Sequence, residues 1–114
     1  MTTWAEPQQS ELTPASDSRA VCAILRAETR PGADTEFATL LNDLADSVRT
    51  GEPGCNSYVA TRAMGSRAHF AVHARFSDWD AFERHADTEH FQRLMPRLTA
   101  LLAAPVSMEL FLEV

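Results

Sequence analysis

The spacing of apolar residues switches between two periods along residues 20–114, and the order of these switches constrains the fold more than any other feature. Apolar residues at every second position indicate a strand, and apolar residues three or four positions apart indicate a helix with one buried face. These patterns predict strands at 20–29, 55–62, 68–76 and 106–114, a helix at 35–49, and a second helical region between Ser77 and Leu102 that is divided near Thr88.

The predicted order β-α-β-β-α-β is typical of a ferredoxin-like α+β fold, in which four strands form one antiparallel sheet with both helical regions on one face. The opposite face of that sheet is too apolar to face water and too charged for a dry core. Such a mixture suits an interface between subunits, so the sequence predicts a homodimer joined through its sheet faces. The predicted interface side chains are Cys22, Ile24, Arg26, Ala71, His73, Arg75, Glu109 and Phe111.

Length and charge exclude several classes of protein. The 114 residues carry a net charge of −6, which makes a nucleic-acid partner a poor fit. No apolar run approaches the roughly 18 residues that cross a membrane. Residues 1–19 are polar and lack the pattern of a signal peptide, so we expect a mobile N-terminal tail, a single domain at 20–114, and a cytoplasmic location.

The sequence gives no expectation of a metal or a cofactor. The chain has no lysine, which removes Schiff-base chemistry and covalent pyridoxal phosphate. Cys22 and Cys55 are too few for a zinc site built from four cysteines, and both are predicted to be small buried side chains. His85 and His90 lack the i, i+4 spacing of a helical metal chelate.

Two histidines are the leading candidates for catalysis. His85 falls on the inward face of the second helical region, one turn after Phe82, where a neutral imidazole can accept a proton near pH 7. The alternative is a half-buried histidine that is bonded to the backbone. His90 lies about 140° further round an ideal helix, so it can share a pocket with His85 only if the helix breaks near Thr88.

Tyr58 is a candidate hydrogen-bond donor to a substrate, and in a regular strand it shares one face with Asn56 and Arg62. The alternative for Tyr58 is a core or interface aromatic. Apolar residues near these polar candidates predict a flat slot for a ring system, although an aromatic stripe at helical spacing is also typical of plain core. The predicted substrate-binding residues are Leu25, Phe70, Val72, Phe76, Trp79 and Phe82.

Two stretches of the chain resemble the antibiotic biosynthesis monooxygenase domain. One is Pro53-Gly54-Cys55 leading into Tyr58, and the other is FSDWDAFERHADTEHF at 76–91, with two histidines five apart ahead of a phenylalanine. The resemblance covers residues 20–114 and implies a dimeric α+β barrel. It also implies oxidation of an anthrone- or quinol-like small molecule by O2 without a cofactor, because a deprotonated phenolic can itself reduce O2 while the protein supplies a dry pocket and a proton acceptor.

The same resemblance keeps two alternatives open. Anthrone-oxidising members of the family carry an Asn, a Trp and a Tyr where this chain has Val72, Phe76 and Phe82, and the haem-degrading branch has its axial histidine where this chain has Met95. The first alternative is an isomerase or cyclase that uses the same histidine on a small oxygenated metabolite. The second is a dimer that binds a hydrophobic small molecule without catalysis.

Overall fold

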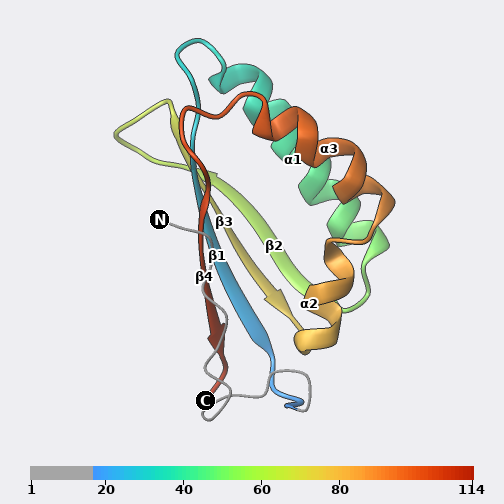
Figure 1. The fold of residues 1–114 in the computed structure, drawn as a ribbon. Coiled ribbons are helices and arrows are strands. Elements are labelled where there is room, and N and C mark those ends of the chain that lie inside the picture. The colour runs from blue at the N-terminus through green and yellow to red at the C-terminus, as the bar shows by residue number, and fades with distance from the viewer. Residues whose placement is uncertain (1–16) are drawn as a thin grey trace.

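The computed structural model describes residues 17–114 and has the predicted order of elements. Residues 1–16, most of the predicted tail, lie outside the described residues. Within the described part, the elements are β1 Val21–Glu28, α1 Asp34–Gly51, β2 Cys55–Arg62, β3 His69–Phe76, α2 Trp79–His85, α3 Glu89–Thr99 and β4 Ser107–Leu112. The helices lie together on one face of the sheet (Figure 1).

The four strands form one antiparallel sheet in the order β2-β3-β1-β4. This arrangement confirms the predicted ferredoxin-like α+β fold. Because β3 lies between β1 and β2, Cys22 and Cys55 stand on strands that are not neighbours, and both thiols are free. None of the helices within residues 17–114 is long and apolar enough to span a membrane.

The core lies between the sheet and α1, as the two periods predict. On β3 every second residue is buried, because successive side chains of a strand point to opposite faces. On α1 the buried residues follow the helical repeat. The buried residues of these two elements are Phe70, Val72, Ala74 and Phe76 on β3, and Phe37, Leu40, Leu41, Leu44, Ala45 and Val48 on α1.

One irregularity in β2 changes which residues share a face. The pairing with β3 shifts between Cys55 and Ser57, where one extra residue is inserted into the strand. As a result Asn56 accepts a hydrogen bond from Arg75 on the outer face of the sheet, at 2.6 Å, while Tyr58 is buried under the helices. The expectation that Asn56 and Tyr58 share a face is therefore wrong, because a bulge reverses the alternation at that point.

Helix caps explain why the second helical region is divided. The Asp78 side chain accepts a hydrogen bond from the Ala81 N–H and begins α2, and the Thr88 side chain accepts one from the Phe91 N–H and begins α3. Side-chain oxygens at these positions satisfy N–H groups that have no partner within the helix. The short break between the two helices turns the chain at residues 86–88, and this turn shapes the site described below.

We expect Gly54→Ala to lower the free energy of unfolding by about 1–3 kcal/mol, because an added methyl group overpacks a tight contact. A Cβ atom at Gly54 would lie 2.7 Å from the Cβ of Ala81, where α2 rests against the start of β2. The matched control is Gly65→Ala, since an added Cβ there meets nothing within 4 Å. Urea unfolding of both variants measures the difference, and equal midpoints would contradict the close approach of α2.

Candidate active site

Three polar side chains that are far apart in the sequence meet beside α2. Glu52 follows the end of α1, His85 is the last residue of α2, and His90 is the second residue of α3. The carboxylate of Glu52 lies 2.9 Å from Nδ1 of His85 and 2.5 Å from Nε2 of His90. We call these three residues the Glu52 cluster.

The Glu52 cluster is largely shielded from water, and this fixes the roles of its atoms. The exposed fractions of the side chains are 9% for Glu52, 10% for His85 and 14% for His90. An ionised carboxylate can only accept hydrogen bonds, so each imidazole donates the N–H that faces it. In the neutral ring of His85, Nδ1 then carries the proton and Nε2 has the free lone pair. That tautomer is the one a general base needs.

The break between α2 and α3 brings the two histidines to the same carboxylate. The hydroxyl of Thr88 donates to the backbone oxygen of His85 at 2.8 Å and accepts from the N–H of Phe91 at 3.3 Å. These bonds close α2 and start α3 in a new direction, so the 140° separation of a continuous helix does not apply. The position of His90 beside His85 thus depends on the Thr88 cap.

Three aromatic rings lie close to the ring of His85. The ring centroid of His85 lies 5.5 Å from that of Tyr58, 5.4 Å from Phe76 and 5.0 Å from Phe91. Such rings exclude water and hold the imidazole in one orientation, which strengthens electrostatic interactions at the site.

Tyr58 can serve as a neutral hydrogen-bond donor at this site. Burial, with smaller effects from Cys55 and Glu52, raises the pKa of the Tyr58 phenol well above its usual range, so the hydroxyl keeps its proton. Within residues 17–114 no side chain or backbone group bonds to that hydroxyl, while the backbone oxygen of Tyr58 accepts from Arg49 at 2.8 Å.

Cys55 lies near the Glu52 cluster but does not have the properties of a nucleophile. Burial and the charge of Glu52 raise the pKa of the Cys55 thiol to about 11, and the thiol lies 3.2 Å from the backbone oxygen of Ser57. Because the thiolate is the reactive form, this cysteine stays unreactive near neutral pH.

The structure divides the predicted substrate-binding residues into separate groups. Phe76 packs edge to face against Phe82, whose ring lies 5.2 Å from that of Trp79. Phe70 lies six positions earlier on β3, about 20 Å away at the rise of a strand, and contacts Phe37 instead. Leu25 and Val72 are paired midway along the sheet. The predicted single slot thus has only its Phe76 end beside His85.

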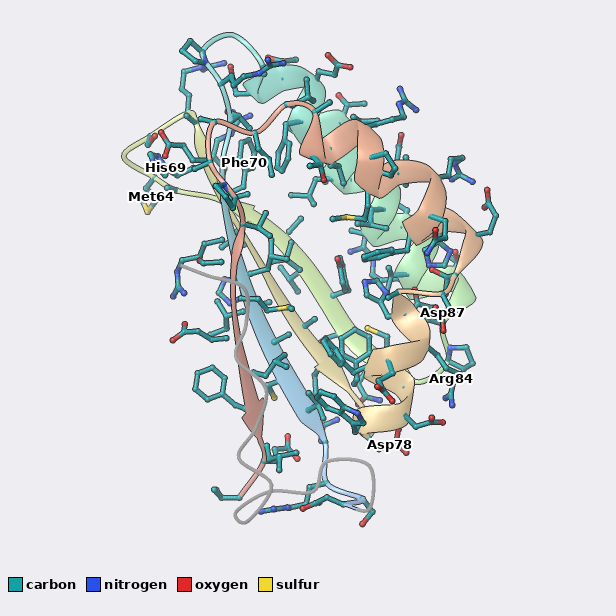
Figure 2. All side chains as sticks on the ribbon, viewed as in Figure 1. Met64, His69, Phe70, Asp78, Arg84 and Asp87 are labelled. Atoms are coloured by element: carbon teal, nitrogen blue, oxygen red, sulfur yellow. The ribbon has the colours of Figure 1, made fainter. Side chains whose placement is uncertain are left out.

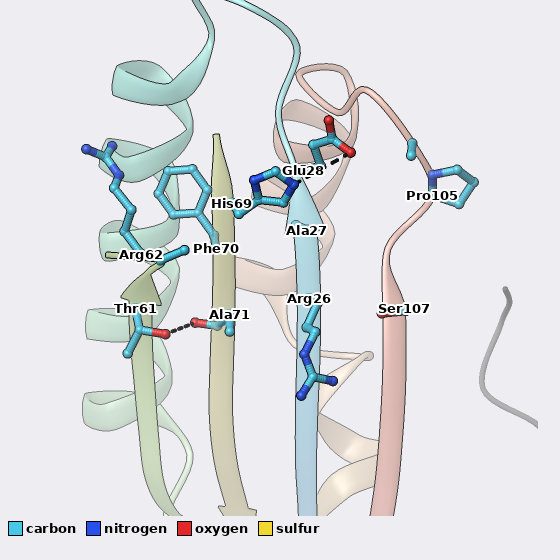
Figure 3. Close-up of a pocket in the computed structure, with 12 residues that line it drawn as sticks. Arg26, Ala27, Glu28, Thr61, Arg62, His69, Phe70, Ala71, Pro105 and Ser107 are labelled. Carbon is cyan, nitrogen blue, oxygen red and sulfur yellow. Dashed lines mark hydrogen bonds and ion pairs between the residues drawn. The ribbon is translucent and has the colours of Figure 1, made fainter. Parts of the chain in front are cut away.

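A surface hollow of about 360 Å³ lies at the opposite end of the sheet, and among the predicted site residues only Phe70 lines it. Figure 3 shows Arg26, Thr61, His69 and Ser107 around this hollow. Figure 2 shows the same separation: His69 and Phe70 lie at one end of the molecule, and Asp78, Arg84 and Asp87 lie at the end that carries α2.

The sequence analysis did not identify Glu52, although its carboxylate contacts both histidines of the site. One local signal was present: the C-terminal end of a helix has a partial negative charge, so a carboxylate just after α1 is unfavourable there without compensation. Residues that break a local rule are often functional. The histidines that supply the compensation are 33 and 38 residues away in the sequence, so the sequence does not display the contact.

The structure is thus a small ferredoxin-like domain, with an antiparallel sheet, helices on one face, and a buried carboxylate that contacts two imidazoles. Residues 20–97 match the model of the antibiotic biosynthesis monooxygenases, and the chain belongs to that family.

Solved structures of similar fold agree with this assignment. A protein named an antibiotic biosynthesis monooxygenase is 26% identical, with a TM-score of 0.78 over 82% of this chain and 98% of its own. The protein PA3566 from Pseudomonas aeruginosa is 27% identical, with a TM-score of 0.77 over 85% of this chain and 96% of its own. A protein from Caulobacter crescentus is 24% identical, with a TM-score of 0.81 over 85% and 92%, and supports the fold. No curated protein matches the chain.

Proposed function

We propose that this protein is a cofactor-independent monooxygenase that oxidises an aromatic, anthrone- or quinol-like metabolite with O2. The observation that carries the proposal is the hydrogen bond from Nδ1 of His85 to the buried carboxylate of Glu52, which leaves Nε2 of His85 as a base among aromatic rings. Family membership supports the same class of reaction.

In the proposed reaction, Nε2 of His85 takes a proton from the substrate, and Glu52 stabilises the imidazolium that forms. The electron-rich anion then reduces O2 by one electron, and the substrate radical and superoxide combine to a peroxide anion. This anion takes the proton back from the His85 imidazolium to give a hydroperoxide, which restores the base. Loss of water leaves a carbonyl, so a CH2 group and O2 give C=O and H2O. The Tyr58 hydroxyl holds the substrate oxygen, and the rings of Phe76 and Phe91 keep water from the intermediates.

The test of this function is oxygen uptake by the purified full chain, without added cofactor, over a panel of anthrones, naphthols and hydroquinones. We expect uptake above the enzyme-free rate, and we expect His85→Gln to lower kcat by about 10²-fold or more, the usual contribution of a general base. The control His69→Gln changes an exposed histidine at the other end of the sheet and keeps full activity.

The same assay separates the two alternative functions. Product formation at equal rates under nitrogen would overturn the monooxygenase and support an isomerase or cyclase. Saturable binding of a panel compound, with no product under either gas, would support a binding protein. An unchanged kcat in His85→Gln would remove His85 from the mechanism.

We also propose that the protein works as a homodimer joined through the outer face of its sheet. That face exposes Phe111, which is 49% accessible, and Val59, which is 50% accessible. Its charged groups already have partners within the chain: Arg26 pairs with Glu109 at 2.8 Å, and Arg75 pairs with Glu113 at 2.6 Å. Paired charges lower the cost of burying such a face against a second copy.

For this interface we expect Phe111→Asp to convert a dimer to a monomer in sedimentation velocity, because a single charge would then be buried without a partner. The control Met64→Asp changes a fully exposed residue and leaves the dimer intact. A monomeric wild type, or a dimer that survives Phe111→Asp, would contradict the proposed interface.

A further inference from the structure

The Glu52 cluster has the donor set of a transition-metal site. Two imidazole nitrogens and one carboxylate oxygen lie within 4.8 Å of one another, and they come from three different segments of the chain. Donors at about 2.1 Å from one tetrahedral ion stand about 3.4 Å apart. The Glu52 carboxylate lies 2.9 Å from Nδ1 of His85 and 2.5 Å from Nε2 of His90, and both distances are shorter than 3.4 Å. The 4.8 Å within which all three donor atoms lie is longer than 3.4 Å. Small side-chain movements therefore suffice to admit an ion.

The burial of the Glu52 carboxylate also favours a bound cation. The side chain of Glu52 is 9% exposed, and within the described residues its partners are the two histidines. Within residues 17–114 no arginine forms an ion pair with Glu52. The arginines nearest in the sequence to these three residues are paired elsewhere: Arg49 with Asp46, Arg84 with Asp80 and Arg93 with Glu89. Burying a carboxylate is costly unless it is paired, and a divalent cation at this place would offset that cost.

We propose that Glu52, His85 and His90 bind a divalent transition-metal ion of the zinc class, and that this ion inhibits proton transfer at the site. Neutral imidazoles with one carboxylate suit zinc and its neighbours better than magnesium or calcium, which prefer oxygen ligands alone. The three protein ligands leave a fourth position for water. The metal site goes beyond the proposed function, while its inhibitory role rests on that function.

Inhibition follows from where the His85 proton lies. Without metal, Nδ1 of His85 donates to Glu52 and Nε2 has the free lone pair. A metal ion takes the lone pair of Nδ1, so the single proton of a neutral ring must move to Nε2. His90 changes in the same way, from a proton on Nε2 to a proton on Nδ1. The total number of protons stays constant, but His85 no longer has a nitrogen that can accept one from a substrate.

The test is direct metal binding to the full chain, purified without a histidine tag and treated with a chelator. Zn²⁺ is titrated by calorimetry, and Co²⁺ serves as a spectroscopic probe of tetrahedral ligation. We expect about one ion per chain. We expect Glu52→Gln and His90→Gln each to lower the metal affinity by at least about 10²-fold, the upper range for loss of a residue that only supports a metal ligand. His69→Gln, which changes an exposed histidine at the other end of the sheet, is the matched control and leaves the affinity unchanged.

The outcomes separate this inference from the proposed function, because metal binding is measured without a substrate. No binding by wild type, wild-type affinity in Glu52→Gln and His90→Gln, or loss of binding in His69→Gln would each overturn the metal site. Oxygen uptake that persists after chelation and falls when Zn²⁺ is added supports both proposals. Oxygen uptake that requires the metal would support the metal site. It would overturn both the inhibitory role of the metal and the cofactor-independent reaction.

Discussion

Glu52→Gln is expected to lower kcat for oxygen uptake by about 10²- to 10⁴-fold, with a much smaller change in KM. The amide keeps the size of the carboxylate but loses its charge, so it no longer stabilises the imidazolium that His85 becomes. The NH2 group of the glutamine also donates rather than accepts. It therefore favours the tautomer of His85 that has its proton on Nε2, the nitrogen that must be free to act as the base. The interaction strengthens as charge develops on His85, so its loss appears in kcat.

Two further variants make the Glu52 result specific. Glu83→Gln removes an exposed carboxylate from α2 and is expected to leave kcat unchanged. The double variant Glu52→Gln/His85→Gln is expected to be about as slow as His85→Gln alone, since residues that act as one unit are not additive. Fully additive losses, or a kcat for Glu52→Gln within about threefold of wild type, would show that Glu52 does not act through His85.

Phe76→Ala is expected to lower the free energy of unfolding by about 3–5 kcal/mol, the usual cost of removing a buried aromatic ring. Phe76 is 1% exposed at the end of β3, and its ring packs against the rings of Phe82 and His85. The cavity that remains would lie under α2, which has few other contacts with the sheet. Chemical denaturation followed by circular dichroism measures the loss.

A comparison within the same cluster of rings tests the physical reason for the Phe76 result. Phe82 is only partly buried, so Phe82→Ala removes less apolar surface from the core and is expected to cost less than Phe76→Ala. Phe76→Leu keeps most of the volume and is expected to cost less again. A Phe82→Ala variant that is as unstable as Phe76→Ala would contradict the assignment of Phe76 as the buried centre of this end of the molecule.

The fold was accessible from the sequence because its signals are local. Alternation along 68–76 identified the buried face of β3, and the helical repeat of 35–49 identified the buried face of α1. The cap at Thr88 was also readable, since a threonine ahead of an apolar repeat is a common start of a helix. These patterns extend over a few residues, so no knowledge of distant parts of the chain was needed.

The candidate site was accessible only in part. His85 was identified from the face on which it falls, and the proximity of His90 depended on a break whose angle no pattern specifies. Glu52 was missed because its partners come from two other segments of the chain. The single extra residue at Asn56 was missed as well, because a bulge depends on how two strands pair.

The sequence by itself determined the order of the elements and which side of each element faces the core, because apolar spacing and helix caps act over one or two turns. The tertiary structure alone decided that Glu52 bridges His85 and His90, and that a bulge at Asn56 places Tyr58 under the helices. The physical reason is that a hydrogen-bonded cluster requires ångström-scale agreement between separate segments. Only the packing of α1, α2 and α3 on the sheet provides that agreement.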